Sequence, residues 1–204
     1  MGVEADLIAY YEAEARGRHR VGHGDLRQNL RERFAVSLRG ESRVHLVDVG
    51  SGPGLDTATW HRDGFQVVGV DLAYGNVELV REQGLVGVTG SLYRLPFRTA
   101  AFDVLWTMST FVHVPDDRFD EAISELIRVV RPGAPLGIGT WGGLDFEGVG
   151  EFGELRPYRF FSLRSHVRWR ELLAMHGALE VFDTFESTGS QGWEYQFAVL
   201  RAPG

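Results

Sequence analysis

Short apolar runs alternate with amphipathic segments through the middle of the chain. Five apolar runs are predicted as strands, at 43–49, 66–71, 86–89, 102–107 and 135–141. Three segments with helical periodicity lie between them, near 55–63, 75–83 and 117–130. Alternation of this kind is typical of a parallel sheet with helices on both faces. We expect Asp116 or Asp117 to cap the last of these helices and Pro132-Gly133 to end it.

The first 40 residues are predicted to form two helices, 7–14 and 26–38. In the second helix an apolar residue recurs every four positions, at Leu26, Leu30, Phe34 and Leu38, so one stripe should face the core. The glycine-rich basic segment between the helices is expected to be a flexible loop. Asp25 is expected to cap the second helix.

The pattern breaks at residues 142–164, which are rich in glycine, acids and aromatics. An insertion of this length is either a functional lid or a surface loop. After it, 165–176 is predicted to be a helix stopped by Gly177, and 179–186 and 193–201 are predicted to be two antiparallel closing strands. We therefore expect one domain, 1–204. It comprises a helical cap (1–40), a core (41–141), an insertion (142–164) and a C-terminal helix with a hairpin (165–204).

Composition narrows the function classes. The chain has 204 residues, 44% of them hydrophobic, which suits one globular domain. No apolar run approaches the ~20 residues that cross a bilayer, and the N-terminus lacks the features of a signal peptide, so the cytoplasm is the expected compartment. The absence of cysteine excludes disulfides, thiolate metal sites and cysteine nucleophiles. A net charge of −7 disfavours a duplex nucleic acid as partner.

Candidate chemistry lies at the ends of the first two strands. Glycines at 50, 52 and 54 follow the first strand directly, and they let a backbone pass close under a ligand. Asp71 ends the second strand, where an acid of a doubly wound sheet accepts hydrogen bonds from a ribose diol. The dinucleotide fingerprint requires glycine where Leu55 stands. A phosphate loop fails as well, because the chain contains no lysine.

The motif Val47 to Gly54 resembles the first motif of the class I S-adenosylmethionine-dependent methyltransferases. Further motifs follow in the order found in the family. Asp71 ends the second strand, residues 95–97 precede the apolar run 102–106, and residues 131–133 precede the run 136–139. The resemblance covers roughly residues 43–141 and is closest to small-molecule enzymes of the type 11 class. It implies a Rossmann-like, doubly wound seven-stranded sheet, mostly parallel, that ends in an antiparallel hairpin. The absence of cysteine removes the radical enzymes that use the same cofactor, since they hold an iron-sulfur cluster on thiolates.

The resemblance also implies a set of cofactor contacts. Asp48 would position the methionine end through its carboxylate or by ordering the glycine turn, and Asp71 would bind the ribose. Ser91 stands where the family usually has an acid for the adenine amino group, so that hydrogen bond is weaker or is made elsewhere. The full expected set is Tyr11, Arg16, Asp48, Gly50, Ser51, Gly52, Gly54, Asp71, Leu72, Ser91, Leu92 and Thr107, with Met108 beside Thr107. Tyr11 and Arg16 would contact the methionine carboxylate or close the site, or else lie in a solvated loop.

The resemblance leaves the acceptor open. His113 is the candidate general base, with a structural role as the alternative. Residues expected to line an acceptor pocket for an apolar or planar molecule are Trp141, Arg159, Phe160, Phe161 and Trp193. No metal site is expected, because His19 and His23 lack a third ligand. We expect methyl transfer to a small-molecule oxygen, nitrogen or carbon nucleophile. The alternatives are a protein that binds S-adenosylmethionine or S-adenosylhomocysteine without turnover, a nucleotide-linked oxidoreductase, and methylation of a macromolecule.

Overall fold

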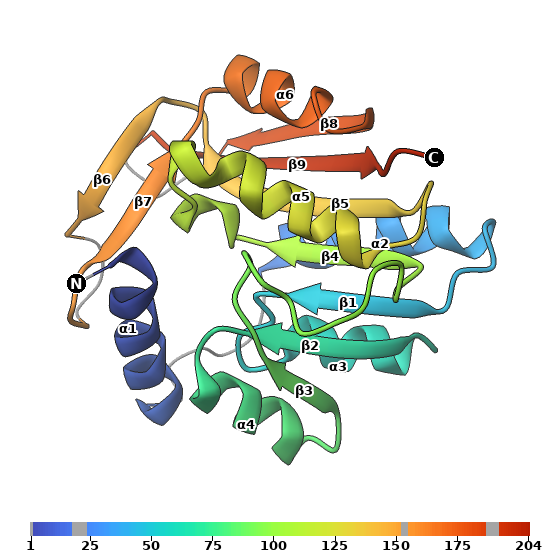
Figure 1. The fold of residues 1–204 in the computed structure, drawn as a ribbon, viewed down its shortest axis with the longest axis horizontal. Helices are drawn as coiled ribbons and strands as arrows, with labels where there is room; N and C mark the ends of the chain where they lie inside the picture. Colours follow the sequence, from blue (N-terminus) through green and yellow to red (C-terminus); the bar gives the residue numbers. More distant parts are fainter. Residues whose placement is uncertain (1, 18–23, 152–154, 187–191) are drawn as a thin grey trace.

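A computed structural model describes residues 2–17, 24–151, 155–186 and 192–204, and its main sheet has seven strands (Figure 1). Their order across the sheet is β3-β2-β1-β4-β5-β9-β8. The strands are β1 (His45–Val49), β2 (Gln66–Asp71), β3 (Val86–Thr89), β4 (Val104–Met108), β5 (Pro135–Gly142), β8 (Ala178–Glu186) and β9 (Glu194–Arg201). Strands β1 to β5 run parallel, and β9 pairs antiparallel with both β5 and β8. The predicted doubly wound seven-stranded sheet with an antiparallel C-terminal hairpin is confirmed.

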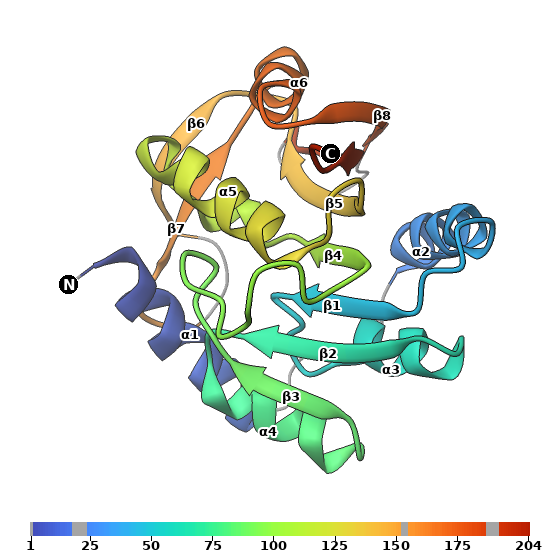
Figure 2. The same ribbon diagram turned by 45° about the vertical axis from the view of Figure 1, so that its right-hand side comes forward.

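Six helices accompany the sheet in the described part of the chain. They are α1 (Val3–Gly17), α2 (Asp25–Arg39), α3 (Leu55–Arg62), α4 (Tyr74–Glu82), α5 (Phe119–Val129) and α6 (His166–Ala174). Helices α5 and α6 cover one face of the sheet and α2 and α3 the other (Figure 2). Each predicted helix and strand is present, with bounds that shift by a few residues.

Strand β1 shows how the period of two divides the core. Leu46 packs into the cluster under α2 and α3, whereas its neighbour Val47 packs under α5 and α6. Both side chains are fully buried. Because β1 is buried on both faces, it appears in the sequence as a continuous apolar run instead of an alternating one.

A missing side chain on β5 makes room in the cluster under α2. A Cβ added to Gly137 would lie 2.6 Å from Cε3 of Trp106 and 3.1 Å from Cε1 of Phe34. The two rings stack with centroids 5.5 Å apart and an interplanar angle of 25°. The indole of Trp106 therefore occupies the space that any other residue at 137 would need.

Both capping predictions are wrong. Asp25 is the first residue of α2, whose N-cap is Gly24 and lacks a side-chain hydrogen bond. Asp116 and Asp117 lie in a short 3₁₀ turn, η2 (Asp116–Arg118), which delays the start of α5. Asp116 instead accepts a hydrogen bond from Nε of Arg164 at 3.0 Å.

The insertion contains a second, two-stranded antiparallel sheet. Its strands are β6 (Phe146–Gly150) and β7 (Arg159–Leu163). Figure 1 shows this sheet beside α1, at the edge toward which the arrows of β1, β2 and β4 point. The carboxyl ends of the parallel strands, where ligands of such sheets bind, are therefore flanked by α1 and β7.

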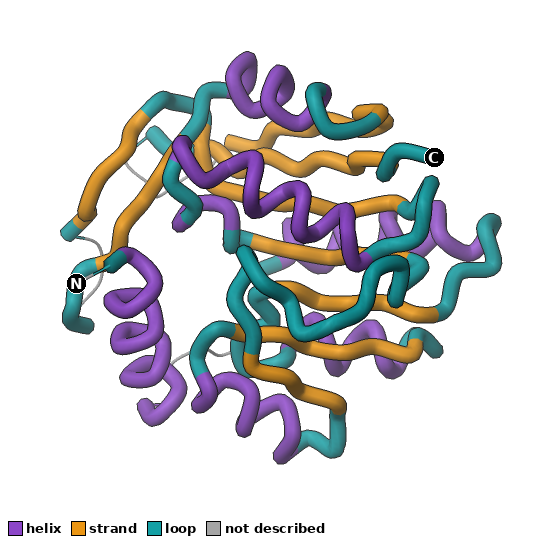
Figure 3. Tube along the Cα trace, viewed as in Figure 1, coloured by secondary structure: helices purple, strands orange, loops and turns teal. Residues whose placement is uncertain are grey.

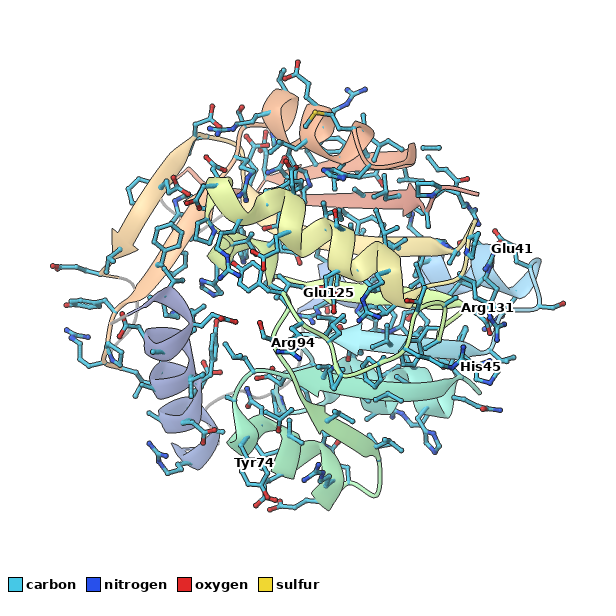
Figure 4. The ribbon with its side chains drawn as sticks, in the orientation of Figure 1. Glu41, His45, Tyr74, Arg94, Glu125 and Arg131 are labelled. Atoms are coloured by element: carbon cyan, nitrogen blue, oxygen red, sulfur yellow. The ribbon has the colours of Figure 1, made fainter. Side chains whose placement is uncertain are left out.

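The opposite edge of the sheet carries an ion-pair cluster. Figure 4 shows His45, Arg131 and Glu41 gathered at the amino ends of the strands. Asp103 accepts hydrogen bonds from Nδ1 of His45 at 2.8 Å and from Arg131. Burial acts to raise the pKa of Asp103, but these partners outweigh it and hold the pKa below its usual value. The charged side chains at this edge are therefore paired with one another.

None of the described helices is long and apolar enough to cross a membrane.

Candidate functional site

A cavity of about 320 Å³ opens at the carboxyl edge of the sheet, within the range of about 300–1,000 Å³ typical of ligand sites. Its walls come from the turn after β1, the tip of β2, the loop after β3, the end of β4, helix α1 and strand β7. A short 3₁₀ helix, η1 (Phe111–His113), completes the wall after β4. The strand ends thus converge on one space that α1 and β7 border.

The glycine turn forms the floor of this cavity. Gly50 and Gly52 line it and have φ angles of 73° and 55°, in the left-handed region that only glycine adopts freely. A Cβ on Gly50 would lie 2.1 Å from Oγ1 of Thr110. Two expected contacts do not reach the cavity wall. Ser51 is buried, and Gly54 is the N-cap of α3, packed against Val80.

Asp71 joins the floor to the next wall. Its Oδ2 accepts from the backbone N–H of Gly52 at 2.8 Å, and its Oδ1 accepts from the N–H of Ala73 at 2.9 Å and from Nδ2 of Asn76 at 3.2 Å. Its carboxylate is largely buried and lines the cavity, followed on the wall by Leu72. An acceptor for hydroxyl groups therefore stands directly beside the glycine floor.

Asp48 lies beneath the turn, fully buried and off the cavity wall. Its Oδ2 accepts from the hydroxyl of Thr57 at 2.6 Å, whereas Oδ1 has no hydrogen-bond partner among the described residues. Burial, followed by the charge of Asp56, raises the pKa of Asp48 to about 7. Its carboxylate therefore meets α3 and does not reach the cavity wall.

An arginine that the sequence analysis missed reaches the cavity. Arg27 of α2 lines the wall, and its Nε donates to Oδ2 of Asp56 at 2.7 Å. The same carboxylate accepts from Nε1 of Trp106 at 2.9 Å and from Nη1 of Arg31 at 3.3 Å. Burial acts to lower the pKa of Arg27, but the charges of Asp56, Tyr195 and Asp48 and the hydrogen bond to Asp56 together outweigh it and raise the pKa, so the guanidinium stays charged. Arg16, expected in this role, is exposed at the end of α1 and off the cavity wall.

Tyr11 and His113 meet across the cavity. Nδ1 of His113 lies 2.7 Å from the carbonyl oxygen of Phe160, which can only accept, so Nδ1 donates. In the neutral ring Nε2 is then the acceptor, and the Tyr11 hydroxyl donates a hydrogen bond to it at 2.8 Å. Nη1 of Arg159 donates to the same phenol oxygen at 3.1 Å. Tyr11, His113 and Arg159 all line the cavity.

Aromatic side chains surround this polar group. Trp141, Phe161 and Trp193, which were expected to line an acceptor pocket, line this cavity. The guanidinium of Arg159 lies over the rings of Tyr10 and Phe161, 4.1 and 5.1 Å from their centroids. Phe160 is not on the wall and contributes its backbone carbonyl.

Of the residues expected to contact the cofactor after β3 and at the end of β4, some line the cavity and others do not. Leu92 lines the cavity, but Ser91 does not, and the Ser91 hydroxyl donates to Oε1 of Glu4 at 2.5 Å. Thr107 is fully buried within the sheet and off the wall, whereas Met108 and Ser109 line it. Ser109 has a φ of 62°, an uncommon conformation for serine that concentrates at functional sites.

The described residues contain no group of three or more histidine, aspartate or glutamate side chains that could hold a metal ion.

Comparison with known proteins relates the core of the chain, which carries most of this site, to methyltransferases. A family model described as a methyltransferase domain matches residues 47–138. The matched residues carry a domain of the class I S-adenosylmethionine-dependent methyltransferases, as the motif order predicted. The malonyl-[acyl-carrier protein] O-methyltransferase of Salmonella typhimurium is 28% identical over 120 residues, which cover 58% of this chain and 47% of that protein. The chain spans about half the length, or less, of the curated relatives first matched.

Solved structures share the fold. The 1,6-didemethyltoxoflavin-N1-methyltransferase of Burkholderia thailandensis, solved with its substrate and S-adenosylhomocysteine, is 19% identical with a TM-score of 0.72. The match covers 98% of this chain and 88% of that one. The [4+2]-cyclase SpnF is also 19% identical, with a TM-score of 0.63 over 79% of this chain and 75% of its own. The same fold therefore carries more than one chemistry.

Proposed function

We propose that this protein binds S-adenosylmethionine and transfers its methyl group to a small-molecule acceptor through an oxygen, nitrogen or carbon nucleophile. One observation carries the proposal. The glycine floor and Asp71 share a single cavity with the Tyr11–His113 pair and its aromatic surroundings. A place for the methyl donor and a place for an acceptor are thus continuous.

The residues of the cavity fit the cofactor. Gly50 and Gly52 leave the floor free of side chains, and Asp71 offers a carboxylate to the ribose hydroxyls. Arg27 would hold the methionine carboxylate by a charge-assisted hydrogen bond, since the other described arginine that lines the cavity, Arg159, donates to Tyr11. Leu72 and Leu92 supply apolar surface for the adenine ring. When bound, the cofactor supplies a methyl group on a sulfonium, which is already an activated leaving group.

The protein's own task is then alignment and proton handling. The aromatic walls exclude water and orient a planar or apolar acceptor. When the acceptor arrives protonated, its proton can pass to the oxygen of Tyr11 while the Tyr11 hydroxyl proton passes to Nε2 of His113. The Phe160 carbonyl already accepts from Nδ1 and so holds the ring for this transfer. Arg159, beside the phenol oxygen, favours negative charge developing there.

A small acceptor is favoured because the aromatic residues enclose the polar group within a cavity. The net charge of −7 also disfavours nucleic acids. The Burkholderia relative in fold, which was solved with a small heterocycle bound, is consistent with that class.

Calorimetric titration with S-adenosylhomocysteine, with NAD in parallel, tests the cofactor. Saturable binding of S-adenosylhomocysteine alone supports the proposal, and binding of NAD alone or of neither contradicts it. A screen of small oxygen, nitrogen and carbon nucleophiles with labelled methyl donor then tests transfer. Cofactor binding with no labelled product from any acceptor would favour a non-catalytic binding protein.

With the acceptor found by that screen, Tyr11→Phe is expected to lower kcat by about 10²-fold, because it removes the group that links the acceptor to His113. Affinity for S-adenosylhomocysteine should stay within about twofold. The matched control is Tyr10→Phe, whose ring lies over Arg159 but off the cavity wall, and it should retain kcat. An unchanged kcat in Tyr11→Phe would exclude proton transfer through this phenol.

A further inference from the structure

The residue that lies beside Ser91 is a carboxylate from a distant part of the chain. We propose that Glu4, from the first turn of α1, accepts the hydrogen bond of the cofactor's adenine amino group, in place of the acid that Ser91 replaces. The inference rests on the proposed function, since it concerns the cofactor of that site. It assigns recognition of the adenine amino group to α1 instead of to the loop after β3.

The hydrogen bonds around Ser91 support this assignment. The Ser91 hydroxyl accepts from the backbone N–H of Tyr93 at 3.1 Å and donates its single proton to Oε1 of Glu4 at 2.5 Å. Its proton is therefore committed, and the hydroxyl positions the carboxylate one hydrogen bond away from residue 91. Oε2 of Glu4 makes no hydrogen bond or ion pair with any residue that the structure describes, and the charge of Glu4 acts on Arg118 and Tyr93.

Glu4 itself lines the cavity, whereas Ser91 does not. On the same wall lie Val3 and Leu7 from α1 and Gly90 and Leu92 from the loop after β3. An apolar slot with one carboxylate at its margin suits a flat ring that carries an exocyclic amine. An ionised carboxylate can only accept, and an amino group donates two protons, so the two are complementary. A ring with a carbonyl at that position would place two acceptors against each other.

Helix α1 carries both Glu4, proposed to bind the adenine, and Tyr11, which contacts His113. Both residues lie on the same cavity wall. Helix α1 is also anchored where Oε1 of Glu12 accepts from the N–H of Gly75 at 3.0 Å. Adenine recognition by Glu4 therefore requires α1 to be seated, which also places Tyr11 beside His113.

The test is a ratio of two affinities. S-adenosylhomocysteine and S-inosylhomocysteine differ at one edge of the purine, where the inosyl compound has a carbonyl at position 6 in place of the amino group and carries a proton on N1. The wild-type protein should bind the adenosyl compound at least about tenfold more tightly, as expected for hydrogen bonds to a charged group. In Glu4→Ala the two dissociation constants should fall within about threefold of each other. The control Asp6→Ala removes the other carboxylate of the first turn of α1, which lies off the cavity wall, and it should keep both affinities and the wild-type ratio.

A second variant restores the acid at the family position. Glu4→Ala combined with Ser91→Asp should recover a preference of about tenfold for the adenosyl compound. The wild-type ratio persisting in Glu4→Ala would overturn the inference, as would wild-type protein that binds both ligands equally, and in both cases the proposed function would stand. Wild-type protein that binds neither ligand would overturn the proposed function and this inference with it.

Discussion

Replacement of Gly50 by valine is expected to abolish detectable binding of S-adenosylhomocysteine, with a loss of at least about 100-fold in affinity. Two effects act together. The φ of 73° disfavours any residue with a Cβ, most of all a β-branched one. The new Cβ would lie 2.1 Å from Oγ1 of Thr110, so the cavity floor must shift or fill. Calorimetric titration measures the loss directly.

The matched control separates backbone strain from loss of the floor. Gly64 has a φ of 94°, and nothing lies within 4 Å of its ideal Cβ. Gly64→Val should therefore show only the cost of the backbone conformation, about 1–3 kcal/mol, with cofactor affinity unchanged. If Gly50→Val folds poorly, Gly50→Ala in a Thr110→Ala background relieves the contact and should recover part of the affinity. Wild-type affinity in a folded Gly50→Val protein would show that the turn does not contact the cofactor.

Asp56→Ala is expected to lower the free energy of unfolding by about 3–5 kcal/mol, the usual result of removing one partner of a buried ion pair. Asp56 is 1% exposed and accepts from Arg27, Arg31 and Trp106. In this variant Arg27, Arg31 and Trp106 all lose the carboxylate to which they donate. Chemical denaturation followed by circular dichroism measures the change.

Asp183→Ala provides the comparison for this second variant. Asp183 also pairs with an arginine, Arg33, at 2.7 Å, but both side chains are substantially exposed, at 33% and 59%. Its removal should cost at most about 1 kcal/mol. A similar small loss in Asp56→Ala would mean that the buried cluster contributes little to stability. Asp56→Ala should also weaken cofactor binding, because Arg27 would lose the partner that orients it.

The fold could be predicted because its signals are local. Each parallel strand is a short apolar run bounded by turns, and the glycine turn after β1 marks the carboxyl edge without reference to the rest of the chain. The cap of α5 was mispredicted because a 3₁₀ turn and a helix cap use the same residue types. A short 3₁₀ turn moves the start of α5 from the predicted residue 117 to Phe119. Nothing in the pair Asp116-Asp117 distinguishes a 3₁₀ turn from a helix cap.

The cavity wall could be predicted only in part. Gly50, Gly52, Asp71, Leu72 and Leu92 lie on it because strand ends point to one edge. Neighbouring positions fall off the wall because successive residues at a strand end face opposite sides, which places Asp48 beneath the turn and Thr107 inside the sheet. A sequence motif shows that a residue lies near the end of a strand. Whether its side chain faces the cavity or the interior depends on how the strand packs.

Glu4 and Arg27 were missed because their partners are remote. Glu4 contacts a residue 87 positions away, and Arg27 pairs with one 29 positions away. No periodicity within α1 or α2 distinguishes these side chains from the exposed charges beside them. Only the docking of both helices at the carboxyl edge selects them.

The tight fit between Gly137 and Trp106 has a consequence for how this protein can diverge. A larger residue at 137 cannot enter while the indole fills the space, and a smaller ring at 106 leaves a void beside Phe34. Each exchange alone disturbs the centre of the sheet, whereas the two together can compensate. Residues 106 and 137 are therefore expected to covary, so that related proteins with a change at one position carry a compensating change at the other.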